Sequence, residues 1–82
     1  MMTANSIRSI LYRSDVYELR TGGWVPSARL FIERSTSYEE IPPLAPPSGV
    51  RCATRAEAET RAVAMAVNWR DQHHSGRPLR YF

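Results

Sequence analysis

Residues 54–73 read TRAEAETRAVAMAVNWRDQH, and this stretch has both the start signal and the apolar periodicity of an amphipathic helix. Thr54 and Glu57 fit the T-x-x-E capping box, in which the hydroxyl and the carboxylate accept hydrogen bonds from backbone N–H groups that otherwise lack partners. Because a helix turns by about 100° per residue, small and apolar side chains gather on one face. These are Ala58, Ala62, Met65, Ala66 and Trp69. The sequence therefore predicts one helix from Thr54 to about His73.

A glycine pair at residues 22–23 predicts a tight turn between two extended segments that precede the helix. We expect these segments, residues 16–20 and 24–34, to pair antiparallel with Arg20 opposite Val25. This register places one mainly apolar set of side chains against the helix. The set is Tyr17, Leu19, Trp24, Ala28, Leu30 and Ile32.

Residues 35–49 carry weak strand and helix signals and are expected to form a proline-rich connector. The segment IPPLAPP, residues 41–47, should run extended because its prolines cannot donate backbone hydrogen bonds. Residues 50–52 can add a short third strand directly before the helix. Together these elements predict an α+β fold, a small antiparallel sheet of two to three strands packed on one C-terminal amphipathic helix.

The length of 82 residues supports one domain. We expect a flexible N-terminus over residues 1–9, a single small α+β domain over residues 10–75, and a C-terminal tail over residues 76–82. A chain of this size buries only about 60% of the surface that it exposes when unfolded. Its stability should therefore be modest, and formation of a homodimer would add to it.

The charge composition admits two explanations. All 11 basic residues are arginine and the net charge is +3. Arginine suits phosphate and base contacts, but codon usage in a GC-rich genome explains the same bias. The single cysteine, Cys52, excludes an internal disulfide and is expected to be a small buried residue. With no secretory signal and no run of about 20 apolar residues, we expect a cytoplasmic protein without a membrane partner.

No pattern for catalysis, nucleotide binding or metal binding is present in the sequence. His73 and His74 are adjacent at the predicted helix end, where successive side chains point in different directions. Glu39 and Glu40 are adjacent in the connector. Neighbouring residues in a flexible loop do not hold two carboxyl groups at the fixed distance that acid–base catalysis needs. The sequence therefore predicts a protein that is not an enzyme and binds no cofactor and no metal.

The order of strands and helix resembles a group of short bacterial proteins that form a domain of unknown function. The resemblance rests on Tyr12-Arg13, VYELR at residues 16–20, a glycine turn, an extended segment over residues 24–33 and TRAEAE at residues 54–59. It implies a strand-strand-strand-helix fold and carries no activity with it.

A second resemblance is to the DNA-binding domains of plant ethylene-response factors and to the N-terminal domains of some phage integrases. It rests on Gly23-Trp24-Val25 and on the helix start from Thr54 to Glu57. Those domains lay a three-stranded sheet in the major groove, and this chain departs from them in its longer connector. The resemblance implies nucleic-acid contacts by Arg20, Trp24, Arg29 and Arg51.

Two binding functions follow as alternatives. The favoured one is a protein-interaction or self-association module, which contacts an unknown protein or a second copy. Its contact surface would be the outward apolar positions Val16, Val25 and Phe31, or a free strand edge.

The alternative is a nucleic-acid-binding module that uses the outer sheet face and the basic tail. In the tail, Arg77 and Arg80 lie close to Tyr81 and Phe82, whose rings could stack on bases or else fold back on an apolar patch or fray. The candidate contact residues for either partner are Arg20, Trp24, Arg29, Arg51, Arg77 and Arg80.

Overall fold

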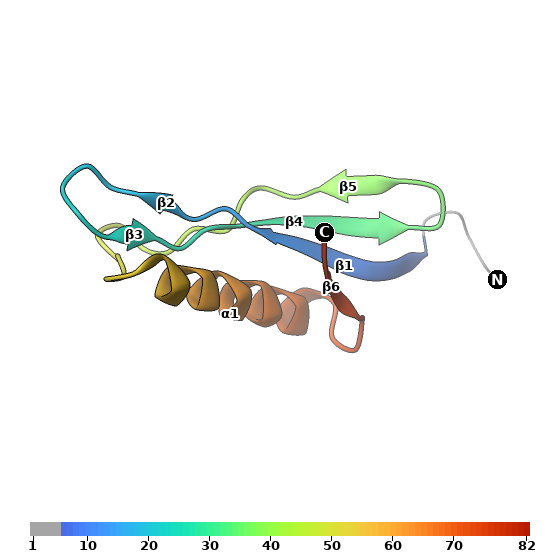
Figure 1. Ribbon diagram of the computed structural model, residues 1–82. Helices are drawn as coiled ribbons and strands as arrows, with labels where there is room; N and C mark the ends of the chain where they lie inside the picture. Colours follow the sequence, from blue (N-terminus) through green and yellow to red (C-terminus); the bar gives the residue numbers. More distant parts are fainter. Residues whose placement is uncertain (1–5) are drawn as a thin grey trace.

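The chain folds into an α+β domain in which one helix lies against a mixed sheet (Figure 1). The computed structural model describes residues 6–82. The elements are β1 (Ile7–Ser14), β2 (Tyr17–Glu18), β3 (Trp24–Val25), β4 (Ala28–Arg34), β5 (Tyr38–Glu40), α1 (Arg55–His73) and β6 (Leu79–Tyr81). A four-stranded sheet has the order β5-β4-β1-β6, and β2 and β3 form a separate two-stranded sheet. The predicted fold class is confirmed, although the main sheet is larger than expected and one of its strand pairs is parallel.

Strands β1 to β4 form one long antiparallel hairpin that runs through both sheets. β1 pairs with β4, and β2 pairs with β3 in a continuation of the same register. Between the two sheets the Asp15 N–H donates to the Ser27 carbonyl oxygen at 2.8 Å, so the ribbon is not interrupted there. This hairpin makes the molecule elongated, with extents of 52 × 20 × 19 Å.

The turn of the hairpin has a different register from the predicted one. Tyr17, rather than Arg20, lies opposite Val25. Leu19 and Gly23 close the turn, and the Leu19 N–H donates to the Gly23 carbonyl oxygen at 2.9 Å. The glycine pair fixes the place of the turn but allows more than one loop length, and the shorter loop forms here.

This shift of three residues exchanges the two faces of the first strand, because side chains alternate along a strand. Val16 packs against the core, whereas Tyr17 is exposed. The prediction that Tyr17 faces the helix and Val16 faces outward is therefore wrong. The inward placement of Ala28, Leu30 and Ile32 is confirmed by their burial.

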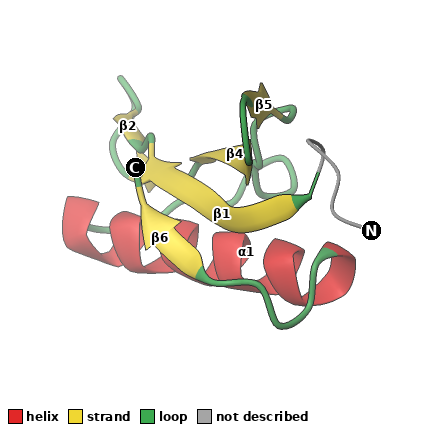
Figure 2. Cartoon of the chain, turned by 90° about the vertical axis from the view of Figure 1, so that its right-hand side faces the viewer, coloured by secondary structure: helices red, strands yellow, loops and turns green. Residues whose placement is uncertain are grey.

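The C-terminal tail is a strand of the main sheet. β6 runs parallel to β1, with Leu79 beside Ile10 (Figure 2). The Ile10 N–H donates to the Pro78 carbonyl oxygen at 2.9 Å, and the Phe82 N–H donates to the Tyr12 carbonyl oxygen at 2.7 Å. A strand of three residues has no periodicity of its own, so only its pairing with β1 defines it.

The strand β1 begins inside the segment that was expected to be flexible. Residues 7–9 belong to β1, so the expectation of a flexible segment over residues 1–9 is wrong there, and residues 1–5 lie outside the described part. Ser9 is buried, and its hydroxyl donates to Glu33 Oε1 at 2.5 Å. This bond lets a polar residue occupy a buried strand position without losing its hydrogen bonding.

The proline-rich connector contains β5 and then follows the edge of the hairpin. Leu44 and Ala28 exchange two backbone hydrogen bonds, at 2.9 and 3.1 Å, and Cys52 and Trp24 exchange two more, at 2.7 and 2.8 Å. Between these two bridges the chain leaves the edge beside Pro26, which has no N–H to offer a pairing strand.

We call residues 45–51 the arch. The predicted third strand at residues 50–52 is reduced to the single bridge at Cys52, because the arch only rejoins the edge at that residue. Cys52 is buried, as the sequence predicts.

Helix α1 begins and ends where the sequence predicts. Thr54 is the N-cap, and its Oγ1 accepts a hydrogen bond from the Glu57 N–H at 3.1 Å. The Glu57 carboxylate in turn accepts from the Ala53 N–H at 2.9 Å. Both halves of a capping box are thus present, although the carboxylate reaches one residue further back than in the usual arrangement.

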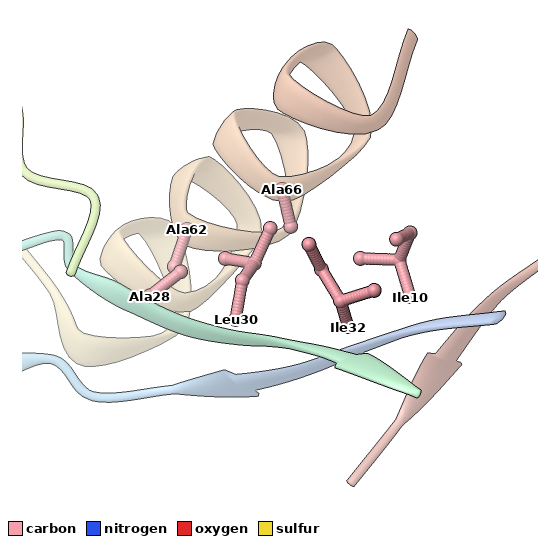
Figure 3. Close-up of a cluster of buried hydrophobic side chains, with 6 residues drawn as sticks. All are labelled: Ile10, Ala28, Leu30, Ile32, Ala62 and Ala66. Atoms are coloured by element: carbon pink, nitrogen blue, oxygen red, sulfur yellow. The ribbon is translucent and has the colours of Figure 1, made fainter. Parts of the chain in front are cut away.

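The helix packs on the hairpin through alanines. Ala58, Ala62 and Ala66 are fully buried. Figure 3 shows Ala62 and Ala66 pointing toward side chains of β4 and β1. Because these side chains are small, the helix backbone lies close to the strands and Leu30 fills the space beside it. The buried cluster comprises Ile10, Ala28, Leu30, Ile32, Ala62 and Ala66.

We predict that Ala62→Leu destabilises the fold by about 1–3 kcal/mol, because extra carbons at this contact force the helix away from the sheet. Ala64→Leu is the matched control, since Ala64 is exposed on the same helix, and its effect should stay within about 0.5 kcal/mol. Urea unfolding followed by circular dichroism measures both. Equal effects of the two substitutions would contradict close helix–sheet packing.

We also predict that Gly22→Ala and Gly23→Ala both destabilise the hairpin, because both glycines have positive φ, 97° and 95°. The conformational cost is about 1–2 kcal/mol for each. Gly23→Ala should cost more, since its Cβ would lie 3.0 Å from the Arg51 side chain and 3.3 Å from the Cys52 carbonyl oxygen. A Cβ at Gly22 meets nothing within 4 Å. Thermal unfolding compares the two, and a smaller loss for Gly23→Ala would refute this turn geometry.

Candidate interaction surface

One face of the four-stranded sheet has no layer over it. Helix α1 covers the face that carries Ile10, Leu30 and Ile32, and among residues 6–82 no helix or strand packs on the opposite face (Figures 1 and 2). Side chains alternate along strands and directly paired residues share a face, so the strand registers define the uncovered set. We call this surface the open face: Ser9, Leu11, Arg13, Arg29, Phe31, Glu33, Tyr38, Glu40, Arg80 and Phe82.

Aromatic rings from three parts of the chain meet on the open face. The Phe82 ring lies beyond β1 from Phe31, yet the two ring centroids are only 4.7 Å apart. Tyr38 is the third member, with its ring centroid 6.3 Å from that of Phe82. Phe82 and Tyr38 remain 51% and 62% exposed, while Leu11 in the middle of the face is buried. Of the alternatives considered for the tail, folding back on an apolar patch describes Phe82, and the patch that it completes is itself still exposed.

Arg29 is held in place on this face by an acidic neighbour. Its Nη2 and Nε donate to Glu40 Oε2 at 2.7 and 3.0 Å. The hydrogen bond and the charge of Glu40 raise the pKa of the Arg29 guanidinium above its ordinary value, and Asp15 adds to the rise. The guanidinium carbon also lies 5.6 Å from the Phe31 ring centroid. The Glu40 carboxylate thus balances the charge of Arg29 locally.

The remaining charges of the open face have mixed signs. Arg13 and Arg80 are exposed and make no ion pair within the described residues. Glu33 accepts a hydrogen bond from Ser9 and has no basic partner in the same part of the chain. With Arg29 and Glu40 included, the open face carries three arginines and two glutamates, so it is patterned rather than uniformly basic.

The six candidate contact residues do not form one site. Arg29 and Arg80 lie on the open face, whereas Arg20, Trp24 and Arg51 lie at the far end of the hairpin, around its turn.

At that end Trp24 is half-buried, with the Arg55 guanidinium carbon 5.8 Å from its ring centroid. Arg51 Nη1 donates to the Gly22 carbonyl oxygen at 3.3 Å. Arg77 lies in the loop after α1, where its carbonyl oxygen accepts from Arg70 at 3.2 Å. Of the residues predicted from the DNA-binding resemblance, Arg20, Trp24 and Arg51 thus lie around the hairpin turn, and Arg29 lies apart from them on the open face.

Sequence reasoning missed Leu11, Arg13 and Tyr38 as members of this surface. β1 carries apolar residues on both faces, so Ile10 and Leu11 give no alternation that shows which one faces the helix. Tyr38 lay in the presumed irregular connector. Of the outward apolar positions predicted, only Phe31 is on the open face.

Two hollows flank the arch away from the open face. One of about 500 Å³ lies between the arch and the end of the hairpin, and one of about 400 Å³ lies between the arch and α1. Their only charged lining residues are Arg51 and Arg61 respectively. Among the described residues, the lining of neither hollow contains an acidic side chain.

Residues 6–82 contain no group of three or more His, Cys, Asp or Glu side chains that could hold a metal ion. In the same part of the chain, no helix is long and apolar enough to cross a membrane. Comparison of the chain with protein-family models, with curated proteins and with solved structures finds no match. The open face must therefore be interpreted from its own chemistry.

We predict an energetic coupling between Phe31 and Phe82 of about 0.5–1.5 kcal/mol, the usual worth of an aromatic pair beyond its buried area. A double-mutant cycle with Phe31→Leu and Phe82→Leu, measured by chemical unfolding, gives this value. The control cycle combines Phe82→Leu with Trp24→Leu at the other end of the hairpin and should be additive. Coupling in the control, or none in the Phe31–Phe82 cycle, would show that the C-terminus is not docked on the open face.

Proposed function

We propose that the protein is a non-enzymatic protein-interaction module whose contact surface is the open face. The observation that carries the proposal is the cluster of Phe31, Tyr38 and Phe82 on a sheet face over which no helix or strand of residues 6–82 packs. Exposed apolar groups gathered in one place are typical of protein contact surfaces, and aromatic residues contribute most to the binding energy of such surfaces.

The mixed charges support a protein partner. Interfaces between proteins commonly surround an apolar centre with polar groups of both signs, which select the partner and its orientation. On the open face Arg13 and Glu33 provide one such group of each sign within two strand positions of Leu11. Their charges are available to a partner, since neither makes an ion pair among the described residues.

Nucleic-acid binding is the second candidate, and the proximity of Arg13 and Arg80 to exposed rings favours it. The acids of the same face oppose it, because Glu33 and Glu40 would lie against a phosphate backbone. We rank it second for this reason.

Capture from a lysate of the native host, quantified by mass spectrometry, tests the proposal. We expect Tyr38→Ser and Phe82→Ser to reduce recovery of bound protein by about tenfold or more, since an interfacial aromatic residue commonly contributes about 2 kcal/mol. Tyr81→Ser is the matched control, because Tyr81 is also exposed but lies on the opposite face of the sheet. There its ring centroid is 5.4 Å from that of Tyr12. It should leave recovery unchanged.

Equal recovery by all variants would refute a role for the open face. Fluorescence anisotropy with labelled single-stranded and double-stranded oligonucleotides, at two salt concentrations, tests the second candidate. Salt-dependent binding that is lost in Arg13→Gln and Arg80→Gln, without capture of any protein, would replace the first candidate by the second.

A further inference from the structure

We infer that the open face binds a second copy of the same chain face to face, so that two sheets form a sandwich with α1 of each copy on the outside. The inference rests on the proposed function and names the partner of the same surface. Three features of the open face support a second copy as its partner: the apolar centre, the arrangement of charges and the area.

The centre of the open face is apolar and can meet its own copy. Leu11 and Phe31 are directly paired neighbours on β1 and β4, and Phe82 reaches over from the β6 side to contact Phe31. Two sheets pack in this way at a separation of about 10 Å, with their strand directions within about 30° of each other. The central pair would then lie against the central pair of the other copy.

The charges on either side of this centre have opposite signs. Two residues along the strands in one direction lie Arg13 and Arg29, which are paired with each other across β1 and β4. Glu33, which is paired with Ser9, lies two residues from the central pair in the other direction. A two-fold axis that lies in the interface, perpendicular to the strands and level with Leu11, places the arginine end of one copy over the Glu33 end of the other. At each end of the interface Arg29 of one copy then lies over Glu33 of the other. Arg13 lies over Ser9, on the strand next to that glutamate, so the charges that meet at both ends have opposite signs.

The flanking charges are compatible with this arrangement. Arg80 and Glu40 are level with Leu11, so each lies near its counterpart in the other copy. Glu40 is already neutralised by Arg29, and Arg80 is on the edge strand, where water screens it.

Pairing through strand edges fits less well. Both edge strands, β5 and β6, are only three residues long. Antiparallel pairing of either strand with its own copy would set Glu39 against Glu39 or Arg80 against Arg80 at the centre. Like charges directly opposite each other in a sheet are destabilising, and charged short edges are a common means of preventing such pairing.

The area of the face sets the strength of the dimer. The 21 residues of the four strands, each spanning about 4.8 Å across the sheet and about 3.3 Å along it, bound about 330 Å² per copy. A standard stable interface buries about 800 Å² per partner. The dimer is therefore weak and depends on concentration, and its dissociation constant lies within reach of sedimentation equilibrium.

Sedimentation equilibrium of the purified chain over a wide concentration series tests the inference. We expect a monomer–dimer equilibrium that Phe82→Ser weakens and Tyr81→Ser leaves unchanged. Arg13→Glu and Glu33→Arg should each weaken self-association by about tenfold or more, because each sets like charges against one another at both ends of the interface. An equimolar mixture of these two variants should associate better than either variant alone, because residue 13 of each copy then differs in sign from residue 33 of the other.

Several outcomes would overturn the inference. They are a strict monomer at the highest concentration, a dimer insensitive to Phe82→Ser, or a mixture of the charge variants that associates no better than either alone. Circular dichroism confirms that each variant is folded. If Phe82→Ser is not folded, Tyr38→Ser replaces it, with the same expected loss of self-association. A monomer that still captures another protein through the open face would refute the second copy and leave the proposed function standing. A protein that neither self-associates nor captures another protein through the open face would refute both the inferred dimer and the proposed function.

Discussion

The close contact between α1 and the hairpin determines the rest of this structure. Ala58, Ala62 and Ala66 place the helix backbone near β4 and β1, so that a short apolar row centred on Leu30 is enough to form a core. Because one helix can cover only one face of a sheet, the same contact leaves the other face without a covering helix or strand among residues 6–82. A small chain can form its core in this way, but one face of its sheet then lacks a covering layer. Another molecule can supply that layer.

The parts of the fold that could be predicted are those whose signals are local. The capping residues Thr54 and Glu57 and the alanine periodicity define α1 without reference to any other element. The glycine pair locates a hairpin, but its register depends on how the two strands and the arch fit together. A shift of three residues was enough to exchange Val16 and Tyr17 between the faces.

The open face was hidden from sequence reasoning for a related reason. It is assembled from β4, from β1, and from two short segments, β5 and β6, whose places depend on pairing rather than on composition. Phe82 joins the surface only because β6 runs beside β1. Arg29 and Phe31, by contrast, lie on a long strand with clear alternation, and their outward placement could be predicted.

Which face the helix covers is the central claim, and methyl-resolved nuclear Overhauser effects measure it directly. We expect cross-peaks that connect the Ala62 and Ala66 methyl groups with the Leu30 and Ile32 methyl groups. None should connect either alanine with the Phe31 ring. Cross-peaks from these alanines to Phe31 would place α1 on the wrong side of the sheet and contradict the account.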